Sequence, residues 1–262
     1  MSPRVLALLP GWGQPPEALA PLAEALPAGW EALPLALPGH GGRPWPEPWD
    51  PAAPRLEAWS EDLDRTLPPN PSASCVLAGW SLGGLVALDL ALRRPRRLAG
   101  LVLLAATPRL AAAPGWPGVP LEALQGVAAE LRSDPARALV RFLALAAGGH
   151  GTLRRLRRAA ARAPAPDPRA LWAGLALLAG CDLRPRLPAL RLPTLVLLGA
   201  EDPLVPSASA RAWPGSPVAR VRRLEGAGHA PFLDRPADCG QALEAFLRDI
   251  AGPGARAAEG PA

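Results

Sequence analysis

The 262-residue sequence predicts an α/β domain built on a mostly parallel sheet of about six strands. Three observations lead to this fold class. Short apolar runs of strand length alternate with helical patterns along the chain. The runs lack the polar alternation of a strand with one face in water, which is typical of parallel strands covered on both sides. A long central segment has no strand candidate, which indicates a helical insertion between two strands.

The expected elements follow one another in a regular order. Strands are predicted at residues 5–9, 32–37, 75–78, 101–105, 194–198 and 219–224. Helices are predicted at residues 17–26, 56–67, 82–94, 208–213 and 237–250. We therefore assign residues 1–107 and 186–251 to the core, and residues 252–262 to a disordered tail rich in glycine and alanine.

The central segment, residues 108–185, is predicted to form a helical lid. Its helical patterns are separated by prolines and lie at residues 121–131, 136–147, 153–163 and 169–178. Residues 109–184 contain eleven arginines and five acidic residues, whereas the rest of the chain has seventeen arginines and eighteen acidic residues. The net positive charge therefore lies in the predicted lid, which indicates a surface for an acidic partner.

Composition excludes several classes of protein. Apolar residues make up 49% of the chain and charged residues 19%, which is typical of a globular domain. No apolar run approaches 18 residues and the first one is too short for a signal peptide, so we expect a cytoplasmic protein. Cys75, Cys181 and Cys239 are widely spaced and only three histidines are present, so we expect no disulfide, metal or other cofactor. Arginine is so frequent in this lysine-free chain that its number alone is no sign of nucleic-acid binding.

The segment Gly79-Trp80-Ser81-Leu82-Gly83 carries the strongest chemical signal. It follows the strand expected at residues 75–78 and opens the helix expected at residues 82–94, which is the context of a G-x-S-x-G nucleophile elbow. A serine in such a strained turn presents its hydroxyl at the carboxyl edge of the sheet, and small neighbours leave room for it. The alternative is a tight turn with a helix-capping serine.

A nucleophilic serine needs a base, and the chain offers three histidines. His229 follows the last expected strand and is the predicted base. His40 lies in a glycine-rich turn and is expected to be a loop residue that lines the site. His150 is expected to be a solvated residue of a turn in the lid.

The acid that orients the base should follow another strand. Asp202 comes just after the strand expected at residues 194–198, with Glu201 as its rival. Asp182 and Asp234 are expected at the surface or at helix caps. The order Ser81, Asp202, His229 is that of the α/β-hydrolase fold, which we therefore predict.

Two backbone N–H groups are expected to form an oxyanion hole. Leu82 follows the nucleophile, and Trp12 lies in the loop Gly11-Trp12-Gly13 after the first strand. The alternative for Trp12 is an aromatic that only packs, although one residue can do both.

Six motifs together point to one family. They are Gly11-Trp12-Gly13, GWSLGGLVAL at the elbow, Trp116-Pro117-Gly118, RFLAL at residues 141–145, Asp182-Leu183-Arg184 and the terminal GHAPF. As a set they resemble the pimeloyl-[acyl-carrier protein] methyl ester esterases of biotin synthesis, from about Val5 to Ile250. Pro10 departs from that pattern, because a histidine commonly precedes the Gly-Trp-Gly loop.

The resemblance implies a substrate and a partner. The acyl chain would lie along Phe142, with Trp12, Ser81, Leu82 and His229 as the other substrate-binding residues. Four arginines of the lid would dock an acidic acyl carrier protein: Arg137, Arg141, Arg154 and Arg158. Each pair is spaced four residues apart and so shares one helix face, as docking requires; the alternative is a pair of solvated faces.

We therefore predict a monomeric carboxylesterase that hydrolyses the methyl ester of pimeloyl-[acyl-carrier protein] by a Ser-His-Asp mechanism. The alternatives are a broad short-chain esterase or thioesterase that meets no carrier protein, and a non-enzymatic receptor of the same fold. A fluorophosphonate probe with turnover of p-nitrophenyl butyrate separates enzyme from receptor. The salt dependence of carrier-ester turnover separates the two enzymes.

Overall fold

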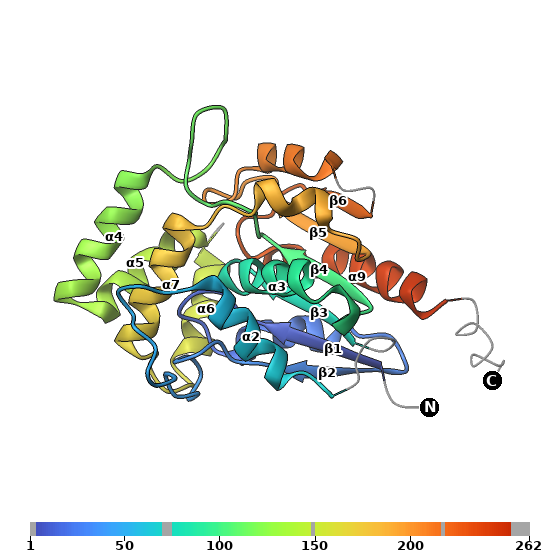
Figure 1. The fold of residues 1–262 in the computed structure, drawn as a ribbon, viewed down its shortest axis with the longest axis horizontal. Coiled ribbons are helices and arrows are strands. Elements are labelled where there is room, and N and C mark those ends of the chain that lie inside the picture. The colour runs from blue at the N-terminus through green and yellow to red at the C-terminus, as the bar shows by residue number, and fades with distance from the viewer. Residues whose placement is uncertain (1–3, 70–74, 148–149, 216–217, 253–262) are drawn as a thin grey trace.

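A parallel sheet of six strands forms the centre of the molecule (Figure 1). The computed structural model describes residues 4–69, 75–147, 150–215 and 218–252. The spatial order of the strands is β2-β1-β3-β4-β5-β6. Their bounds are β1 Arg4–Leu9, β2 Trp30–Pro34, β3 Cys75–Trp80, β4 Gly100–Leu104, β5 Thr194–Gly199 and β6 Ala219–Leu224. The fold and number of strands predicted from the sequence are confirmed. Apart from Gly252, the predicted tail lies outside the described residues.

The four inner strands send successive side chains to two separate cores. In β1, Ala7 and Leu9 pack with α2 (Leu56–Thr66) and α3 (Leu82–Arg93) on one face. Leu6 and Leu8 pack on the other face with α1 (Ala20–Glu24) and α9 (Pro236–Ala251). Because neighbouring side chains of a strand point to opposite faces, an inner strand must be apolar throughout.

The two edge strands differ from their predictions in different ways: β2 in its bounds, and β6 only in its burial. β2 ends at Pro34 instead of residue 37, because the chain leaves the sheet after the Leu35 N–H donates to the Leu8 carbonyl. Leu35 and Leu37 are still buried, so the apolar run marks a covered loop. β6 was expected to be buried, but most of its residues are exposed, among them Arg222. Arginines on an exposed edge discourage pairing with a further strand.

Prolines shorten several helical segments. The helix predicted at residues 17–26 is a 3-10 turn, η1 (Pro16–Leu19), followed by α1. Pro21 has no N–H to donate, and the Ala20 N–H bonds to the Glu17 carbonyl instead. The segment predicted at residues 208–213 is also 3-10, within η4 (Ser207–Gly215). The remaining short elements are η2 (Pro95–Arg97), η3 (Arg184–Ala189) and α8 (Pro231–Asp234). No helix in the described part of the chain has the length and apolar character needed to cross a membrane.

Four helices form an insertion between β4 and β5, at one end of the sheet (Figure 1). They are α4 (Leu121–Ser133), α5 (Pro135–Ala146), α6 (His150–Ala160) and α7 (Pro168–Gly180). Asp134 and Asp167 cap α5 and α7 by accepting backbone N–H groups two or three residues on. Among its described residues the insertion has isolated bridges but no strand, as expected.

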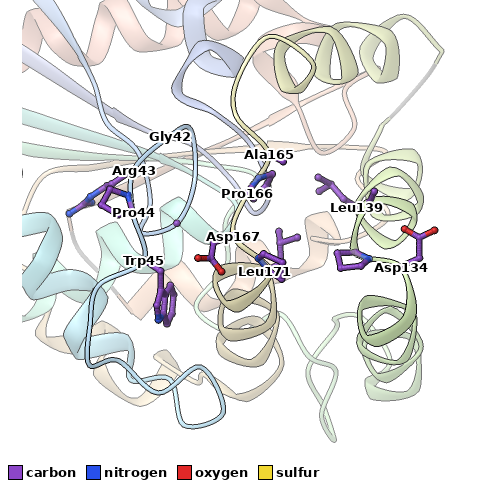
Figure 2. A pocket seen from close by; sticks show the side chains of 14 residues that line it. Gly42, Arg43, Pro44, Trp45, Asp134, Leu139, Ala165, Pro166, Asp167 and Leu171 are labelled. Carbon is purple, nitrogen blue, oxygen red and sulfur yellow. The ribbon is translucent and has the colours of Figure 1, made fainter.

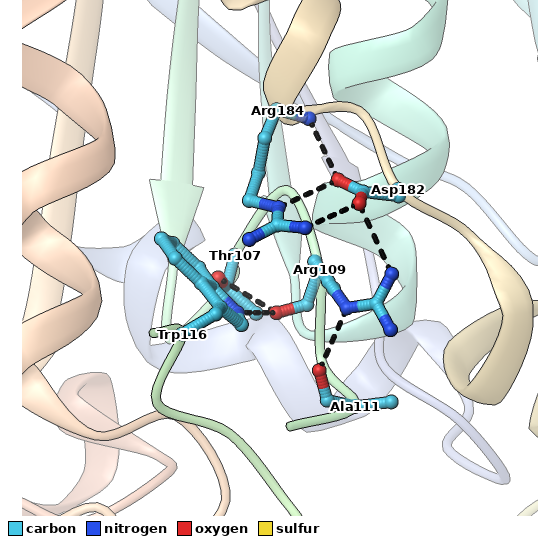
Figure 3. A network of polar contacts seen from close by, with 6 residues as sticks. All are labelled: Thr107, Arg109, Ala111, Trp116, Asp182 and Arg184. Carbon is cyan, nitrogen blue, oxygen red and sulfur yellow. Dashed lines mark hydrogen bonds and ion pairs between the residues drawn. The ribbon is translucent and has the colours of Figure 1, made fainter. Parts of the chain in front are cut away.

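A polar network joins the two ends of the insertion (Figure 3). The Asp182 carboxylate accepts hydrogen bonds from Arg184, at 2.6 and 2.8 Å, and from Arg109 at 3.0 Å. The Arg184 guanidinium also lies 4.9 Å from the centroid of the Trp116 ring. The hydrogen bonds from Arg184 are the main cause that lowers the pKa of Asp182 to about 2. Asp182, expected at the surface or at a cap, thus also fixes the base of the insertion.

The order of the strands places the site. The chain moves from β1 outward to β2 and then returns to β3 on the other side of β1. Loops that follow β1 and β3 therefore diverge and leave a crevice at the carboxyl edge of the sheet, where α/β proteins bind their ligands. The Gly11-Trp12-Gly13 loop follows β1, and Ser81 follows β3.

Candidate active site

Ser81 occupies a strained turn between β3 and α3. Its backbone has φ +54° and ψ −118°, a conformation that a residue with a side chain rarely adopts. The flanking glycines are required by space: a Cβ on Gly79 would lie 2.5 Å from the Gly83 carbonyl oxygen, and one on Gly83 would lie 2.4 Å from that of Pro10. Such strain persists where the surrounding structure fixes it, and it is typical of functional residues.

His229 and Asp202 complete a chain of hydrogen bonds that begins at Ser81. His229 Nε2 lies 2.9 Å from Ser81 Oγ, and His229 Nδ1 lies 2.8 Å from Asp202 Oδ2. An ionised carboxylate only accepts, so Nδ1 carries the proton and Nε2 of the neutral ring is free to accept from the serine hydroxyl. The side chains of His229 and Asp202 are 1% and 0% exposed, so water does not compete for these bonds.

Asp202 and Glu201, the two candidates for the acid, have different surroundings in the structure. Asp202 Oδ1 accepts the N–H groups of Leu204 and Val205 at 2.8 and 2.9 Å, which stabilises the buried carboxylate and fixes its direction. The neighbouring Glu201 is exposed to solvent. Only Asp202 is therefore placed to orient His229.

Two contacts that the sequence did not predict hold the loop of His229. Trp80 Nε1 donates to the His229 carbonyl at 2.6 Å, which ties the loop to the elbow. The Gly228 N–H donates to Asp234 Oδ2 at 2.9 Å. Asp234 was expected at the surface or at a cap, but it is half-buried against this loop. Trp80 and His229 are far apart in the sequence, and the bond between Gly228 and Asp234 depends on how the intervening segment folds back, so no local pattern signals either contact.

The two expected oxyanion donors belong to segments next to the nucleophile. Leu82 opens α3, so its N–H has no acceptor within the helix. The Trp12 N–H forms no hydrogen bond with any other residue that the structure describes. The loops lie close together, because a Cβ on Gly11 would come within 3.2 Å of the Ser81 Cβ. Two N–H groups without an acceptor can stabilise an oxyanion if both point to the position that it will occupy.

The insertion covers the Gly11-Trp12-Gly13 loop. Trp12 Nε1 donates to the Leu171 carbonyl of α7 at 2.8 Å, and its ring meets the Phe142 ring of α5 edge-on with centroids 4.7 Å apart. Both rings are buried. Phe142 therefore lies beside the loop that contains Trp12. The Trp12 side chain packs against the insertion in addition to the backbone role predicted for this residue.

Two hollows of very different size lie under and beside the insertion. The hollow at Ser81 has a volume of only about 10 Å³ and is bordered by Leu110 and Leu178. A hollow of about 690 Å³ opens between the loop around Trp45 and the first turns of α5 and α7 (Figure 2). Leu139 lines that larger hollow and packs on the loop, since a Cβ on Gly13 would lie 2.2 Å from Leu139 Cδ1.

The four predicted docking arginines are exposed to solvent. Arg137 and Arg141 of α5 are 77% and 64% exposed and pair with Glu130 of α4, at 3.1 and 3.3 Å. Arg154 and Arg158 are exposed on α6 and form no ion pair with any residue that the structure describes. All four therefore lie on the solvent side of two adjacent helices of the insertion.

The remaining histidines lie elsewhere. His40, expected in a loop from which it could line the site, is fully buried and borders neither of these two hollows. Its Nδ1 lies 2.8 Å from the Pro38 carbonyl oxygen, and burial lowers its pKa to about 4. His150, expected in a turn, is the first residue of α6, and its side chain lies outside the described part of the structure.

Comparisons with known proteins match most of the chain. The model of the alpha/beta hydrolase family matches residues 6–242. A pimeloyl-[acyl-carrier protein] methyl ester esterase from Aromatoleum aromaticum is 43% identical over 93% of this chain and 98% of its own. Another from Aeromonas salmonicida is 40% identical over 88% and 90%. An esterase structure from Exiguobacterium antarcticum superposes with a TM-score of 0.83 at 20% identity, over 94% of this chain and 92% of that one; at that identity the likeness concerns the fold alone.

Proposed function

The chain belongs to the pimeloyl-[acyl-carrier protein] methyl ester esterases of the α/β-hydrolase family, and we propose that Ser81, His229 and Asp202 carry out its ester hydrolysis. One observation carries the proposal. A serine hydroxyl held in a strained elbow shares a hydrogen bond with a buried histidine, whose other nitrogen is bonded to a buried carboxylate. This arrangement is the one that activates a serine for acyl transfer.

The reaction proceeds in two halves. Ser81 Oγ attacks the ester carbonyl while His229 Nε2 takes its proton, and Asp202 stabilises the resulting imidazolium. The N–H groups of Trp12 and Leu82 bind the oxyanion. His229 then returns the proton to the departing methanol. Water, activated by the same histidine, attacks the acyl-enzyme and releases the free carboxylic acid, which regenerates Ser81.

The proposed substrate is the methyl ester of pimeloyl-[acyl-carrier protein], as the names of the curated relatives indicate. A carrier protein is acidic, and the predicted lid holds the net positive charge of the chain. We place the carrier on the solvent side of α5 and α6, where Arg137, Arg141, Arg154 and Arg158 are exposed. Guanidinium groups suit carboxylates and phosphate because they form paired hydrogen bonds.

The proposal gives the insertion the role of a lid. The hollow at Ser81, of about 10 Å³, is far smaller than the hollow of about 690 Å³ that Leu139 lines. Trp12 and Phe142 are buried against each other, so Phe142 on α5 can lie along an acyl chain only when the insertion moves. Closure around a bound ester would exclude water from the oxyanion hole.

One comparison of substrates tests the proposal. Purified protein is given the carrier-bound pimeloyl methyl ester or the free pimelate methyl ester, with Ser81→Ala as the inactive control. We expect a kcat/KM at least tenfold higher for the carrier-bound ester, and no turnover or fluorophosphonate labelling by Ser81→Ala. Equal turnover of both esters would indicate a broad-specificity esterase, and a Ser81→Ala variant with wild-type rates would refute the assigned nucleophile.

A further inference from the structure

Asp234 forms hydrogen bonds to two different parts of the molecule. It is the last residue of α8 and follows His229 by five residues. Its Oδ2 accepts the Gly228 N–H at 2.9 Å, from the residue just before His229. Its Oδ1 accepts the hydroxyl of Thr152, which is buried in the first turn of α6. One half-buried carboxylate therefore joins the loop of His229 to a helix of the insertion.

The hydrogen bond between Asp234 and Gly228 holds together the two ends of the segment that contains His229. The segment from Gly228 to Asp234 returns on itself, so that the carboxylate at its end fixes the N–H at its beginning. Trp80 Nε1 holds the His229 carbonyl between these two points. With the backbone fixed on both sides, the imidazole keeps the position that lets it contact Ser81 and Asp202 at once. A shift of about 1 Å in such a group costs about a hundredfold in rate.

The bond to Thr152 anchors α6 at its first turn. Further along the same helix lie Arg154 and Arg158, which are exposed and bear the positive charge proposed to meet the carrier. α6 also packs against α8 and η1, so its first turn lies over the core while its arginines face solvent. Asp234 therefore accepts hydrogen bonds from both the loop of His229 and α6, the helix that carries Arg154 and Arg158.

We propose that Asp234 is a positioning residue, which holds His229 in its productive place through Gly228 and fixes α6 of the insertion through Thr152. This inference rests on the role of His229 proposed above. The carboxylate suits both tasks because it can accept two hydrogen bonds in different directions at once. Bonds to a charged acceptor are also stronger than those between neutral groups.

Four variants separate the two contacts. Asp234→Ala loses both acceptors, and we expect its kcat on p-nitrophenyl butyrate to fall about tenfold to a hundredfold, with KM changed less than about threefold. Asp234→Asn keeps an acceptor oxygen for Gly228 and should restore kcat to within about threefold of wild type. Thr152→Val removes only the contact to α6 and should cost less kcat than Asp234→Ala. Asp238→Ala removes an exposed carboxylate that pairs with Arg235 at 2.8 Å, and serves as the matched control in the same segment.

A spectroscopic measurement distinguishes positioning from general loss of structure. The proton of His229 Nδ1, held by Asp202, should give a far-downfield NMR signal that is absent from the spectrum of His229→Gln. We expect Asp234→Ala to broaden or shift this signal while its melting temperature stays within a few degrees of that of Asp234→Asn. An unchanged signal and kcat in Asp234→Ala, with Ser81→Ala inactive, would overturn the proposal and leave the mechanism intact. Equal losses in Thr152→Val and Asp234→Ala would overturn the role of the Gly228 contact.

Discussion

Asp202 and Glu201 differ in what their side chains can reach. Asp202 is bonded to His229 and to two backbone N–H groups, whereas Glu201 is exposed. We expect Asp202→Asn to lower kcat on p-nitrophenyl butyrate by about a thousandfold or more, since an amide favours the wrong tautomer of the histidine. Glu201→Gln, the matched control, should stay within about twofold. Steady-state kinetics of both variants checks this, and a large loss in Glu201→Gln alone would mean that the acid is wrongly assigned.

His40 makes the stability of the fold depend on pH. Burial lowers its pKa to about 4, from the 6.5 of an exposed histidine, so the unfolded chain binds this proton more readily than the folded one. The histidine's contribution is therefore full above pH 6.5 and is lost as the pH falls towards 4. Between pH 7.5 and 5 this amounts to about 2 kcal/mol.

Urea unfolding at both pH values measures this contribution. We expect the free energy of unfolding of wild type to fall more between pH 7.5 and 5 than that of His40→Gln, which has no proton to gain. The test holds even if His40→Gln is less stable than wild type at pH 7.5. What is compared is the change in the free energy of unfolding of each protein between pH 7.5 and pH 5. The same decrease in both proteins would show that other groups cause it.

The positions of individual residues were predictable from the sequence where local geometry sets them. Ser81 is an example, because a strand, a helix and three glycines around it allow few other structures. The burial of His40 and the contacts of Asp234 depend on segments that meet only in the folded chain. The pairing of Arg137 and Arg141 with Glu130 likewise follows from how α5 packs on α4, which the sequence alone does not determine.

At the scale of elements, the network of Arg109, Asp182 and Arg184 closes the insertion at its base. Asp182→Asn removes the charge that both arginines share, and we expect it to lower the free energy of unfolding by about 1 to 2 kcal/mol at pH 7. Asp238→Asn breaks an exposed pair with Arg235 and should cost less than about 0.5 kcal/mol.

The pH dependence of this loss provides a second readout. Because the pKa of Asp182 is lowered to about 2, its contribution is complete above the ordinary value of 3.8 and disappears as the pH falls through 2. The difference between wild type and Asp182→Asn in urea unfolding should therefore shrink below pH 4. A difference that stays constant down to pH 2.5 would show that the charge of Asp182 is not its source.

Most strands and long helices were predicted close to their observed bounds, and the exposed strand β6 matches its predicted residues 219–224. The strands β3 and β5 and the helices α2, α3 and α9 begin within one or two residues of their predicted positions. The errors gather where prolines interrupt an apolar pattern, at β2, α1 and η4. There, apolar side chains are buried by loops or 3-10 turns, and the apolar pattern cannot show which hydrogen bonds the backbone forms.

At the scale of the whole molecule, the charge of the insertion faces outward while the proposed chemistry lies beneath it. Replacing Arg137, Arg141, Arg154 and Arg158 by glutamine should lower kcat/KM on the carrier-bound ester by tens- to a hundredfold and spare p-nitrophenyl butyrate. Each exposed arginine contributes no more than about 1 kcal/mol, but the four act on one encounter. Arg137 and Arg141 already pair with Glu130, so we expect the larger part of the loss from the two arginines of α6.

A variant of equal charge makes this test specific. Glutamine at Arg55, Arg94, Arg96 and Arg222, which are exposed on the core outside the insertion, removes the same total charge and should leave the carrier-bound ester within about threefold of wild type. Raising ionic strength should reproduce the effect of the lid variant, which carries glutamine at the four arginines of α5 and α6. The distance over which salt screens a charge shortens from about 10 Å at 0.1 M to about 3 Å at 1 M. Losses that are equal in both variants would mean that net charge alone attracts the carrier. Equal losses on both substrates would mean that the lid arginines support the fold of the insertion. Only a loss confined to the lid variant and to the carrier-bound ester supports docking on α5 and α6, because p-nitrophenyl butyrate requires Ser81 but has no acidic surface to meet the arginines.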